Sequence, residues 1–415
     1  MYSGVVHHYW DRPGGGQLVC GSVAKAFEVL GYKPVLASVP RFELRDKYVE
    51  WFGIDLNNYD VVNFIGIKLK SFGIYLRLFV GYLIKKVVKR YSPSIIFTDE
   101  CTYRNVERIV RERSIMFIEY IHFPMEISID SRYRGSGLYY GEDPYILERY
   151  SKFPMNIYWW GYSKMLSMFL RRNPFEIASL VLTNSRWTAD LCRQIYGDIP
   201  KVLNPPIAPN VEVLKKPREF DERDNIVVML GRFSEEKRYH WVIEEILSIL
   251  KKEVNDVKLY IFGGAKTRTS ISYLKRIEEL ARRRGFRASR RINDSADLYL
   301  VPDASRSTIN NVMDRAKVFL HATINEHWGI AVAEAMARGL PVVVHRSGGT
   351  WSDLVAEGVY GYGYTDAQEA IETVSRILTD KSIWSSFSAK SIAKAKNLTL
   401  DKFIEQFRYL VKPLT

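Results

Sequence analysis

Short runs of β-branched and aliphatic residues alternate with amphipathic helical stretches along most of this 415-residue chain. Such alternation is typical of parallel β-sheets that are covered by helices on both faces. The clearest helical patterns are Trp241–Leu250 and Ile271–Arg284. The runs that predict strands are Val5–Trp10, Pro34–Val39, Ser94–Thr98, Ile115–Ile121, Leu180–Asn184, Ile226–Leu230, Val257–Phe262, Asp297–Val301, Lys317–His321 and Pro341–His345. The sequence therefore predicts an α/β fold.

The length of the chain predicts two domains, because one hydrophobic core rarely extends over so many residues. A proline-rich, charged segment between residues 204 and 224 separates one finished αβ unit from a fresh strand. We expect a Rossmann-like domain over residues 1–205 and a second one over 206–395, facing each other across a cleft. Residues 396–415 should form a helix that closes the fold and packs back toward the N-terminal domain. Its apolar stripe consists of Leu400, Phe403, Phe407 and Leu410.

Composition excludes several classes of protein. Three cysteines lie far apart, which argues against a disulfide framework or a thiolate metal site and fits a reducing compartment. The net charge is +13, but the basic residues are scattered and form no long tail. A basic protein whose positive charge binds nucleic acid or a membrane surface is one class of function to consider. Nucleic acid is disfavoured, because no binding module and no basic–aromatic cluster is recognisable.

One segment is relevant to membranes. The N-terminus lacks the form of a signal peptide, and there is no apolar stretch of about 20 residues that would span a bilayer. Residues 72–87 carry an apolar stripe beside basic residues, the pattern of a helix at a membrane surface. The stripe and its basic neighbours are Phe72, Leu76, Phe79, Val80, Leu83 and Val87, with Lys70, Lys85, Lys86, Lys89 and Arg90. The pattern predicts peripheral attachment to an anionic membrane, and a core helix with the same stripe is the structural alternative.

The segment Asn325–Gly339 is the most informative motif. It follows the predicted strand Lys317–His321, and Gly339 with Pro341 marks the end of its alanine-rich helix. Glu326 should lie in the loop above the strand, with Glu334 one to two turns into the helix. Between them, Gly329 and Ile330 should open that helix, whose free amides attract phosphate or sugar oxygens. Two glutamates eight residues apart also arise by chance. Their placement in a strand–loop–helix unit is therefore the stronger indication of a binding site.

A second motif, Gly231–Arg238, follows directly after the predicted strand Ile226–Leu230. Gly231 permits a tight exit from the strand. Arg232 and Lys237 then lie at the carboxyl end of the sheet, and together they suit a diphosphate whose leaving charge must be stabilised. A helix start whose arginine pairs with a neighbouring glutamate is the structural alternative.

Three further segments lie where predicted strands end, at the carboxyl edge of a sheet. The run Gly14-Gly15-Gly16 opens a helix after the first strand, and consecutive glycines allow backbone to approach a ligand closely. His122 leaves its strand just before Pro124, whereas His7 and His8 are expected earlier on theirs and rank lower. Ser347–Thr350 forms another loop of small residues. There is no Asp-x-Asp, zinc-helix motif, nucleophile elbow or Walker loop, so no metal site and no hydrolase or ATPase is predicted.

In this order, these segments resemble the family 4 glycosyltransferases, which adopt the GT-B fold and retain anomeric configuration. Gly231–Arg238 is similar to their Gly-Arg-x-x-x-x-Lys motif, and Glu326 to Glu334 matches their Glu-x7-Glu signature. Val181–Thr188 and Asn204–Pro206 are similar to their interdomain segments. Within that family, His122–Pro124 and His321–Gly329 most resemble mannosyltransferases that extend dolichol-linked oligosaccharides with α-1,2-mannose.

The resemblance implies a role for each site residue. Arg232 and Lys237 would neutralise the leaving nucleotide diphosphate without a metal ion, and Glu334 would bind the ribose hydroxyls. Glu326, with the amides around Gly329 and Ile330, would hold hydroxyls of the donor sugar. His122 would complete that site when the domains close, and Gly15 and Gly16 would lie close to the diphosphate and acceptor.

The implied reaction is a cytoplasmic hexosyl transfer from a sugar nucleotide to a glycan or polyprenyl-linked acceptor, with no further cofactor. GDP-mannose is the favoured donor. A UDP- or ADP-sugar glucosyltransferase of the same fold is an alternative, as is a phosphorylase or a sugar-nucleotide epimerase. The oligomeric state is left open by the sequence.

Overall fold

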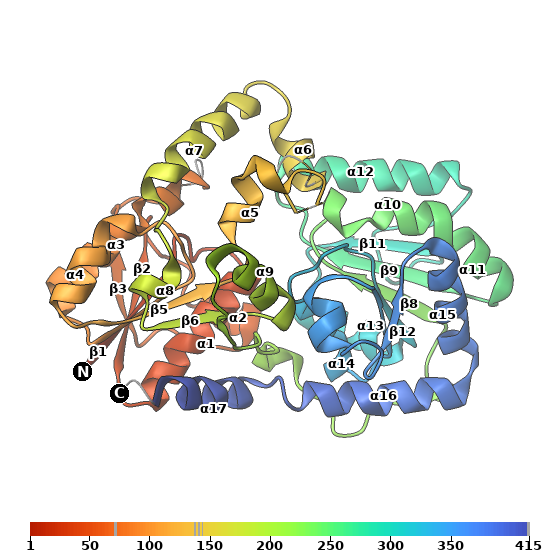
Figure 1. The fold of residues 1–415 in the computed structure, drawn as a ribbon. Coiled ribbons are helices and arrows are strands. Elements are labelled where there is room, and N and C mark those ends of the chain that lie inside the picture. The colour runs from red at the N-terminus through yellow and green to blue at the C-terminus, as the bar shows by residue number, and fades with distance from the viewer. Residues whose placement is uncertain (70–72, 137, 140–141, 143, 413–415) are drawn as a thin grey trace. The chain divides into compact units, whose positions relative to one another are not determined.

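A computed structural model describes residues 1–69, 73–136, 138–139, 142 and 144–412 of the chain. The chain forms two compact units, each built on its own β-sheet (Figure 1). The first unit comprises Met1–Tyr139, Tyr150–Asn210 and Leu398–Thr415. The second comprises Val211–Asn397 and the short segment Tyr140–Arg149.

The sheet of the first unit has the strand order β3-β2-β1-β4-β5-β6-β7 among the described residues, and every neighbouring pair is parallel. Its strands are β1 (Tyr2–Val6), β2 (Lys33–Ser38), β3 (Asp60–Asn63), β4 (Ile95–Thr98), β5 (Met116–Ile121), β6 (Leu180–Thr183) and β7 (Lys201–Val202). The helices of this unit are α1 (Gly15–Val29), α2 (Lys47–Phe52), α3 (Val80–Tyr91), α4 (Glu107–Glu112), α5 (Met125–Ile129), α7 (Met155–Phe169), α8 (Pro174–Ile177), α9 (Arg186–Tyr196) and α17 (Leu400–Val411), with 3₁₀ turns η1 (Tyr75–Phe79), η2 (Arg104–Val106) and η3 (Ser131–Tyr133).

The second sheet repeats this plan with the order β10-β11-β9-β8-β12-β13-β14 in the described part of the chain, again all parallel. Its strands are β8 (Ile226–Leu230), β9 (Lys258–Gly263), β10 (Ala288–Ser289), β11 (Leu298–Pro302), β12 (Val318–His321), β13 (Val342–His345) and β14 (Tyr362–Tyr364). The main helices are α10 (Tyr239–Trp241), α11 (Leu247–Glu253), α12 (Arg268–Arg283), α13 (Arg306–Arg315), α14 (Ile330–Ala337), α15 (Ala367–Thr379) and α16 (Lys381–Ala395). Two parallel sheets with helical crossovers confirm the predicted α/β class of fold.

The strands that the sequence pattern does not mark are β3, β7, β10 and β14. Each of them lies at an edge of its sheet. Edge strands are half exposed and short, so their residues lack the continuous apolar run of a central parallel strand. The two residues of β7 and the two of β10, for example, include no fully buried side chain.

The first strand is shorter than predicted. The pattern Val5–Trp10 suggests a strand because all these side chains are apolar or aromatic, but β1 ends at Val6. Trp10 is fully buried in the loop that follows, where its indole N–H donates to the carbonyl of Ala37 at 2.8 Å. The prediction that His7 and His8 lie within the strand is therefore wrong, and both follow its carboxyl end.

The segment proposed for membrane contact is a core helix. In α3, Leu83 and Val87 are fully buried against the first sheet, together with Val80. Phe79 is 38% exposed, whereas Lys70 and Phe72 lie outside the described residues. The apolar stripe of this segment thus belongs to the domain core and provides no motive for membrane binding. None of the helices in the described ranges combines the length and the apolar character needed to cross a bilayer.

The last helix, α17, packs against α1 within the first unit. The ring of Phe407 meets that of Phe27 edge to face, with 5.4 Å between centroids. The Gln406 amide also donates to the carbonyl of Val202 at 3.2 Å. These contacts explain why Phe403 and Phe407 carry the apolar stripe of this helix.

Candidate functional site

Each sheet has one point at which its strand order reverses, and the functional candidates gather there. In the first unit, the chain passes outward from β1 to β2 on one side and returns to β4 on the other. In the second unit, β8 lies between β9 and β12 in the same way. Open parallel sheets bind their ligands at the carboxyl ends of strands beside this switch point. The two units are described separately below.

In the second unit, an ion pair joins the two predicted motifs. The Lys237 ammonium lies 2.6 Å from Glu326 Oε2, although 89 residues separate them in the chain. His321, at the end of β12, places its Nε2 3.1 Å from the same oxygen. The side chains of Lys237 and Glu326 are 16% and 21% exposed, so both remain reachable from solvent. The Glu326 carboxylate therefore contacts both the Lys237 ammonium and the His321 imidazole at the switch point.

The charge states of this cluster follow from its surroundings. Burial by itself would raise the pKa of Glu326, but the Lys237 ammonium and the His321 hydrogen bond hold it well below its ordinary value. Burial lowers the pKa of His321, with Lys237 acting in the same direction and Glu326 opposing them. Glu326 is thus an anion and His321 a neutral imidazole that donates its Nε2–H to the carboxylate.

Loops of small residues hold Glu326 in place. The amide of Gly349 donates to the Glu326 carbonyl at 2.7 Å, and a Cβ at Gly348 would lie 2.3 Å from that carbonyl oxygen. Gly329 has a φ of +91° and precedes Ile330, the first residue of α14. A side chain at Gly329 would meet Thr350 at 2.3 Å. The predicted Ser347–Thr350 loop therefore acts as a support for the Glu326 loop.

The remaining two predicted residues of this unit lie apart from the cluster. Arg232 is 63% exposed at the side chain and lies 3.2 Å from Glu236. Glu334 is buried inside α14 and forms a bidentate pair with Arg306, at 2.8 and 3.2 Å. The sequence analysis did not identify Arg306, which is the first residue of α13 and follows the helix-capping Ser305.

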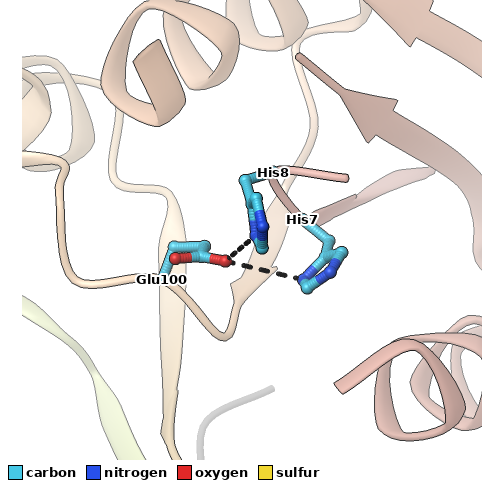
Figure 2. Close-up of side chains that lie close together, drawn as sticks. All are labelled: His7, His8 and Glu100. Carbon is cyan, nitrogen blue, oxygen red and sulfur yellow. Dashed lines mark hydrogen bonds and ion pairs between the residues drawn. The ribbon is translucent and has the colours of Figure 1, made fainter. Parts of the chain in front are cut away.

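In the first unit, residues after β1, β4 and β5 form a buried cluster of histidines and carboxylates. His7 Nδ1 lies 2.7 Å from Asp99 Oδ1, and His122 Nε2 lies 3.0 Å from Asp99 Oδ2. His8 Nδ1 pairs with Glu100, which also lies 3.7 Å from His7 Nδ1 (Figure 2). Asp99 and Glu100 were missed, although Thr98-Asp99-Glu100 leaves a predicted strand at its carboxyl end.

Asp99 determines how the two histidines that it touches are protonated. Burial alone would raise the pKa of Asp99, but His7 and His122 lower it below the ordinary value of an aspartate. An anionic Asp99 accepts one hydrogen bond from an N–H group of each ring. The second nitrogen of His7 accepts from the Gln17 amide at 3.0 Å, so His7 is fully occupied. His122 instead has a 32% exposed side chain, with Nε2 bound and Nδ1 on the opposite edge of its ring.

Gly16 lies against this cluster. A Cβ at Gly16 would lie 3.0 Å from Asp99 Oδ2 and 3.5 Å from His122 Nε2. Gly15 is the first residue of α1, after the extended Gly14. Because Gly16 has no side chain, the start of α1 can lie close to the Asp99 carboxylate.

Two overlapping groups have ligand atoms close enough for a metal ion, His7 with His8 and Glu100, and His7 with Cys20 and Asp99. The hydrogen bonds of His7 to Asp99 and Gln17 occupy both of its ring nitrogens. The cluster is therefore self-sufficient as a network of hydrogen bonds, and we assign it no metal.

The buried His8 predicts a dependence of stability on pH. Burial, opposed by Glu100, lowers the pKa of His8 to about 3, with His7 and Arg77 acting in the same direction as burial. Between this value and the ordinary pKa of 6.5, the unfolded chain binds a proton that the folded chain does not. The stabilisation is complete above pH 6.5 and is lost as the pH falls, by about 1.4 kcal/mol per pH unit. Urea unfolding of wild type and His8→Gln across this range should give curves that converge toward low pH. Parallel curves would contradict the neutral buried state of His8.

Comparison with known proteins finds a family match within the second unit. Residues 210–397 match the family described as glycosyl transferases group 1. A GDP-Man:Man(3)GlcNAc(2)-PP-Dol alpha-1,2-mannosyltransferase from Dictyostelium discoideum is 25% identical over 309 residues, 71% of this chain and 58% of that protein. The enzyme of the same name from Eremothecium gossypii is 25% identical over 193 residues, 45% of this chain and 32% of that protein. The chain thus spans between a third and three fifths of the length of these relatives.

Among solved structures, sucrose-phosphate synthase from Thermosynechococcus elongatus superposes with a TM-score of 0.68 at 15% identity. The match covers 100% of this chain and 98% of that one, which shows a common fold. The Lys237–Glu326 pair lies inside the matched family region, at the sheet edge where such folds bind ligands. The chain therefore has the GT-B fold, and its residues 210–397 match the glycosyl transferases group 1 family.

Proposed function

We propose that this protein is a retaining hexosyltransferase that uses a sugar nucleotide and needs no metal ion. The observation that carries this proposal is the Lys237–Glu326–His321 cluster within the glycosyl transferases group 1 domain. It combines a cation for a leaving phosphate with an anion for sugar hydroxyls at one sheet edge. Residues 206–395 would bind the nucleotide sugar, residues 1–205 the acceptor, and residues 396–415 would complete the N-terminal domain.

The leaving group would be stabilised by positive charge. An ammonium carries three donors, so Lys237 can contact a diphosphate while it keeps its bond to Glu326. The guanidinium of Arg232 has a side chain that is 63% exposed and lies 3.2 Å from Glu236, and it would contact the same phosphate. Because charge on the bridging oxygen increases as the glycosidic bond breaks, both cations act more strongly in the transition state than in the ground state.

The sugar and ribose would be held by carboxylates and amides. Glu326, held anionic by Lys237, would accept hydrogen bonds from donor-sugar hydroxyls, and the amides near Gly329 and Ile330 would add donors. Glu334 would bind the ribose, with Arg306 fixing the carboxylate from its other side. His122 would offer its Nδ1 to a sugar hydroxyl, while Gly15 and Gly16 would bring backbone close to the diphosphate and acceptor.

GDP-mannose is the proposed donor, and a polyprenyl-linked glycan is the proposed acceptor. The support is the similarity to enzymes whose name specifies GDP-mannose and a dolichol-linked glycan. Such an acceptor resides in a membrane, so a peripheral location on its cytoplasmic face is part of the proposal.

Thermal shift with GDP-, UDP- and ADP-sugars tests the donor, followed by product analysis with acceptor. A ligand at 100 times its dissociation constant stabilises the folded state by about 2.7 kcal/mol. GDP-mannose should shift the transition most, and mannose should appear on the acceptor with its α configuration retained. A stronger shift with UDP- or ADP-glucose would indicate a glucosyltransferase instead. Turnover without any acceptor would indicate an epimerase or phosphorylase.

The two glutamates should separate binding from turnover. Glu334→Gln is expected to weaken nucleotide affinity by about ten- to a hundredfold with a smaller change in kcat, because a ribose contact acts in ground and transition states alike. Glu326→Gln should lower kcat while nucleotide affinity changes little. Calorimetric titration of GDP and steady-state kinetics measure the two effects, with the exposed Glu372→Gln as the matched control. Equal GDP affinity in wild type and Glu334→Gln would mean that the ribose binds elsewhere.

A further inference from the structure

Helix α7 presents large apolar side chains to solvent along one face. Ile157, Trp160 and Met168 are 58%, 63% and 61% exposed, and Met165 is 38% exposed. Counted from Ile157, the other three lie three, eight and eleven residues along the helix, which places all four on the same side. Single exposed apolar residues are normal, but a row of them on one helix indicates a contact surface. We call Ile157, Trp160, Lys164, Met165 and Met168 the α7 face.

The opposite side of α7 is firmly packed, so the helix cannot turn the α7 face inward. Leu166 is fully buried and Tyr162 is 2% exposed. The hydroxyl of Tyr75 donates to the carbonyl of Tyr158 at 2.8 Å, and its ring lies 5.6 Å from that of Tyr162. The contacts of this side with η1 hold the orientation of the helix.

The charged residues in the segment that carries the α7 face are all positive. The sequence contains no aspartate or glutamate from Ser151 to Asn173. Lys152, Lys164 and Arg172 are exposed there, and Lys164 lies within the α7 face itself. At the end of α7, the ring of Phe169 lies 6.5 Å from that of Tyr82, which is 43% exposed at the start of α3. The exposed Lys86 and Lys89 of α3 extend the basic surface from there.

We propose that the α7 face docks on the surface of an anionic lipid bilayer, with its apolar side chains in the interfacial layer and the surrounding cations on lipid phosphates. An apolar helix face with a tryptophan and flanking lysines suits this layer. A symmetric contact with a second copy of the chain would bring Lys152, Lys164 and Arg172 against identical charges. The bilayer, unlike a second copy, supplies the opposite charge. This inference does not depend on the proposed reaction.

Co-sedimentation with vesicles tests the docking surface. The full chain should pellet with phosphatidylcholine vesicles that contain phosphatidylserine, less with pure phosphatidylcholine, and less again as salt is raised. Ile157→Ser/Trp160→Ser/Met168→Ser should weaken binding by about tenfold or more. The triple variant Ile249→Ser/Ile271→Ser/Tyr409→Ser removes exposed apolar side chains elsewhere and should bind as wild type does. Lys152→Glu/Lys164→Glu/Arg172→Glu should abolish the preference for anionic lipid.

Thermal unfolding and tryptophan fluorescence distinguish loss of docking from loss of the fold. The thermal transition and the shift caused by nucleotide should be the same in the α7 variant and in wild type, which shows that the variant is folded and that docking is separate from donor binding. Brominated lipids should quench wild-type fluorescence more than that of Trp160→Phe. Vesicle binding that survives the α7 substitutions, or wild type that stays in the supernatant at low salt, would overturn the proposal. A dimer in light scattering that the α7 substitutions dissociate, without vesicle binding, would identify a contact between copies instead.

Discussion

Replacing Lys237 by alanine is expected to lower kcat/KM by about 30- to 1000-fold, or about 2–4 kcal/mol of transition-state stabilisation. The substitution removes the cation that would balance the leaving diphosphate. It also removes the partner that lies 2.6 Å from Glu326. Because the Lys237 ammonium lowers the pKa of Glu326, that pKa should rise in the variant. The acidic limb of the pH–rate profile should therefore move to higher pH, which loss of a phosphate contact alone would not produce.

Three comparisons complete this experiment. Arg232→Ala should reduce kcat/KM within the same range but leave the acidic limb in place, because Arg232 pairs with Glu236 and not with Glu326. The exposed Lys252→Ala controls for the loss of one positive charge. Activity should survive EDTA in every variant. Complete loss of wild-type activity with chelator, restored by magnesium, would refute the metal-free scheme.

Replacing Asp99 by asparagine is expected to lower kcat by about 10²- to 10⁴-fold with only a modest change in thermal stability. The carboxylate accepts an N–H from His7 and another from His122. An asparagine offers one acceptor oxygen and one NH₂ group in nearly the same volume. One histidine must then change tautomer. Because Gln17 holds His7 in its present tautomer, His122 should change, and its Nδ1 would become a donor.

A double-mutant cycle separates this positioning role from a merely structural one. If Asp99 acts through His122, Asp99→Asn/His122→Ala should be no slower than His122→Ala alone. Additive losses would mean that Asp99 acts independently of His122. The exposed Asp60→Asn is the matched control for the change of charge, and thermal unfolding of each variant checks that the fold is retained. Chemical shifts of the His122 ring nitrogens report the tautomer directly.

Central strands were predictable from the sequence because they are buried on both faces. β8 has the predicted bounds, and β5 and β12 begin only one residue late. For β3, β7, β10 and β14 the local signal is weak, because an edge strand is stabilised by backbone bonds to one neighbour more than by its own apolar side chains. Trp10 shows the converse error, since a buried aromatic residue in a loop resembles the end of a strand.

Local sequence likewise located Lys237, Glu326, Glu334 and His122, since motif position after a strand is a one-dimensional property. Which of these residues pair with one another cannot be predicted from the local sequence. Lys237 and Glu326 are 89 residues apart, and His7 and Asp99 are 92 apart. Such pairs form because parallel strands bring their carboxyl ends to one edge in an order that differs from chain order. The assignment of Asp99 as the carboxylate of two histidines therefore required the folded sheet.

By itself, the amino-acid sequence determined the class of fold, the central strands and the residues that leave their carboxyl ends, because each of these depends on the polarity of consecutive residues. Tertiary structure decided which charges neutralise one another and which apolar faces are covered. The stripes of α3 and α7 illustrate the difference: Leu83 is fully buried against the sheet, whereas Trp160 is 63% exposed. The helical spacing of apolar residues shows that a helix has an apolar face. Only the neighbouring elements decide whether that face packs against protein or is exposed to solvent.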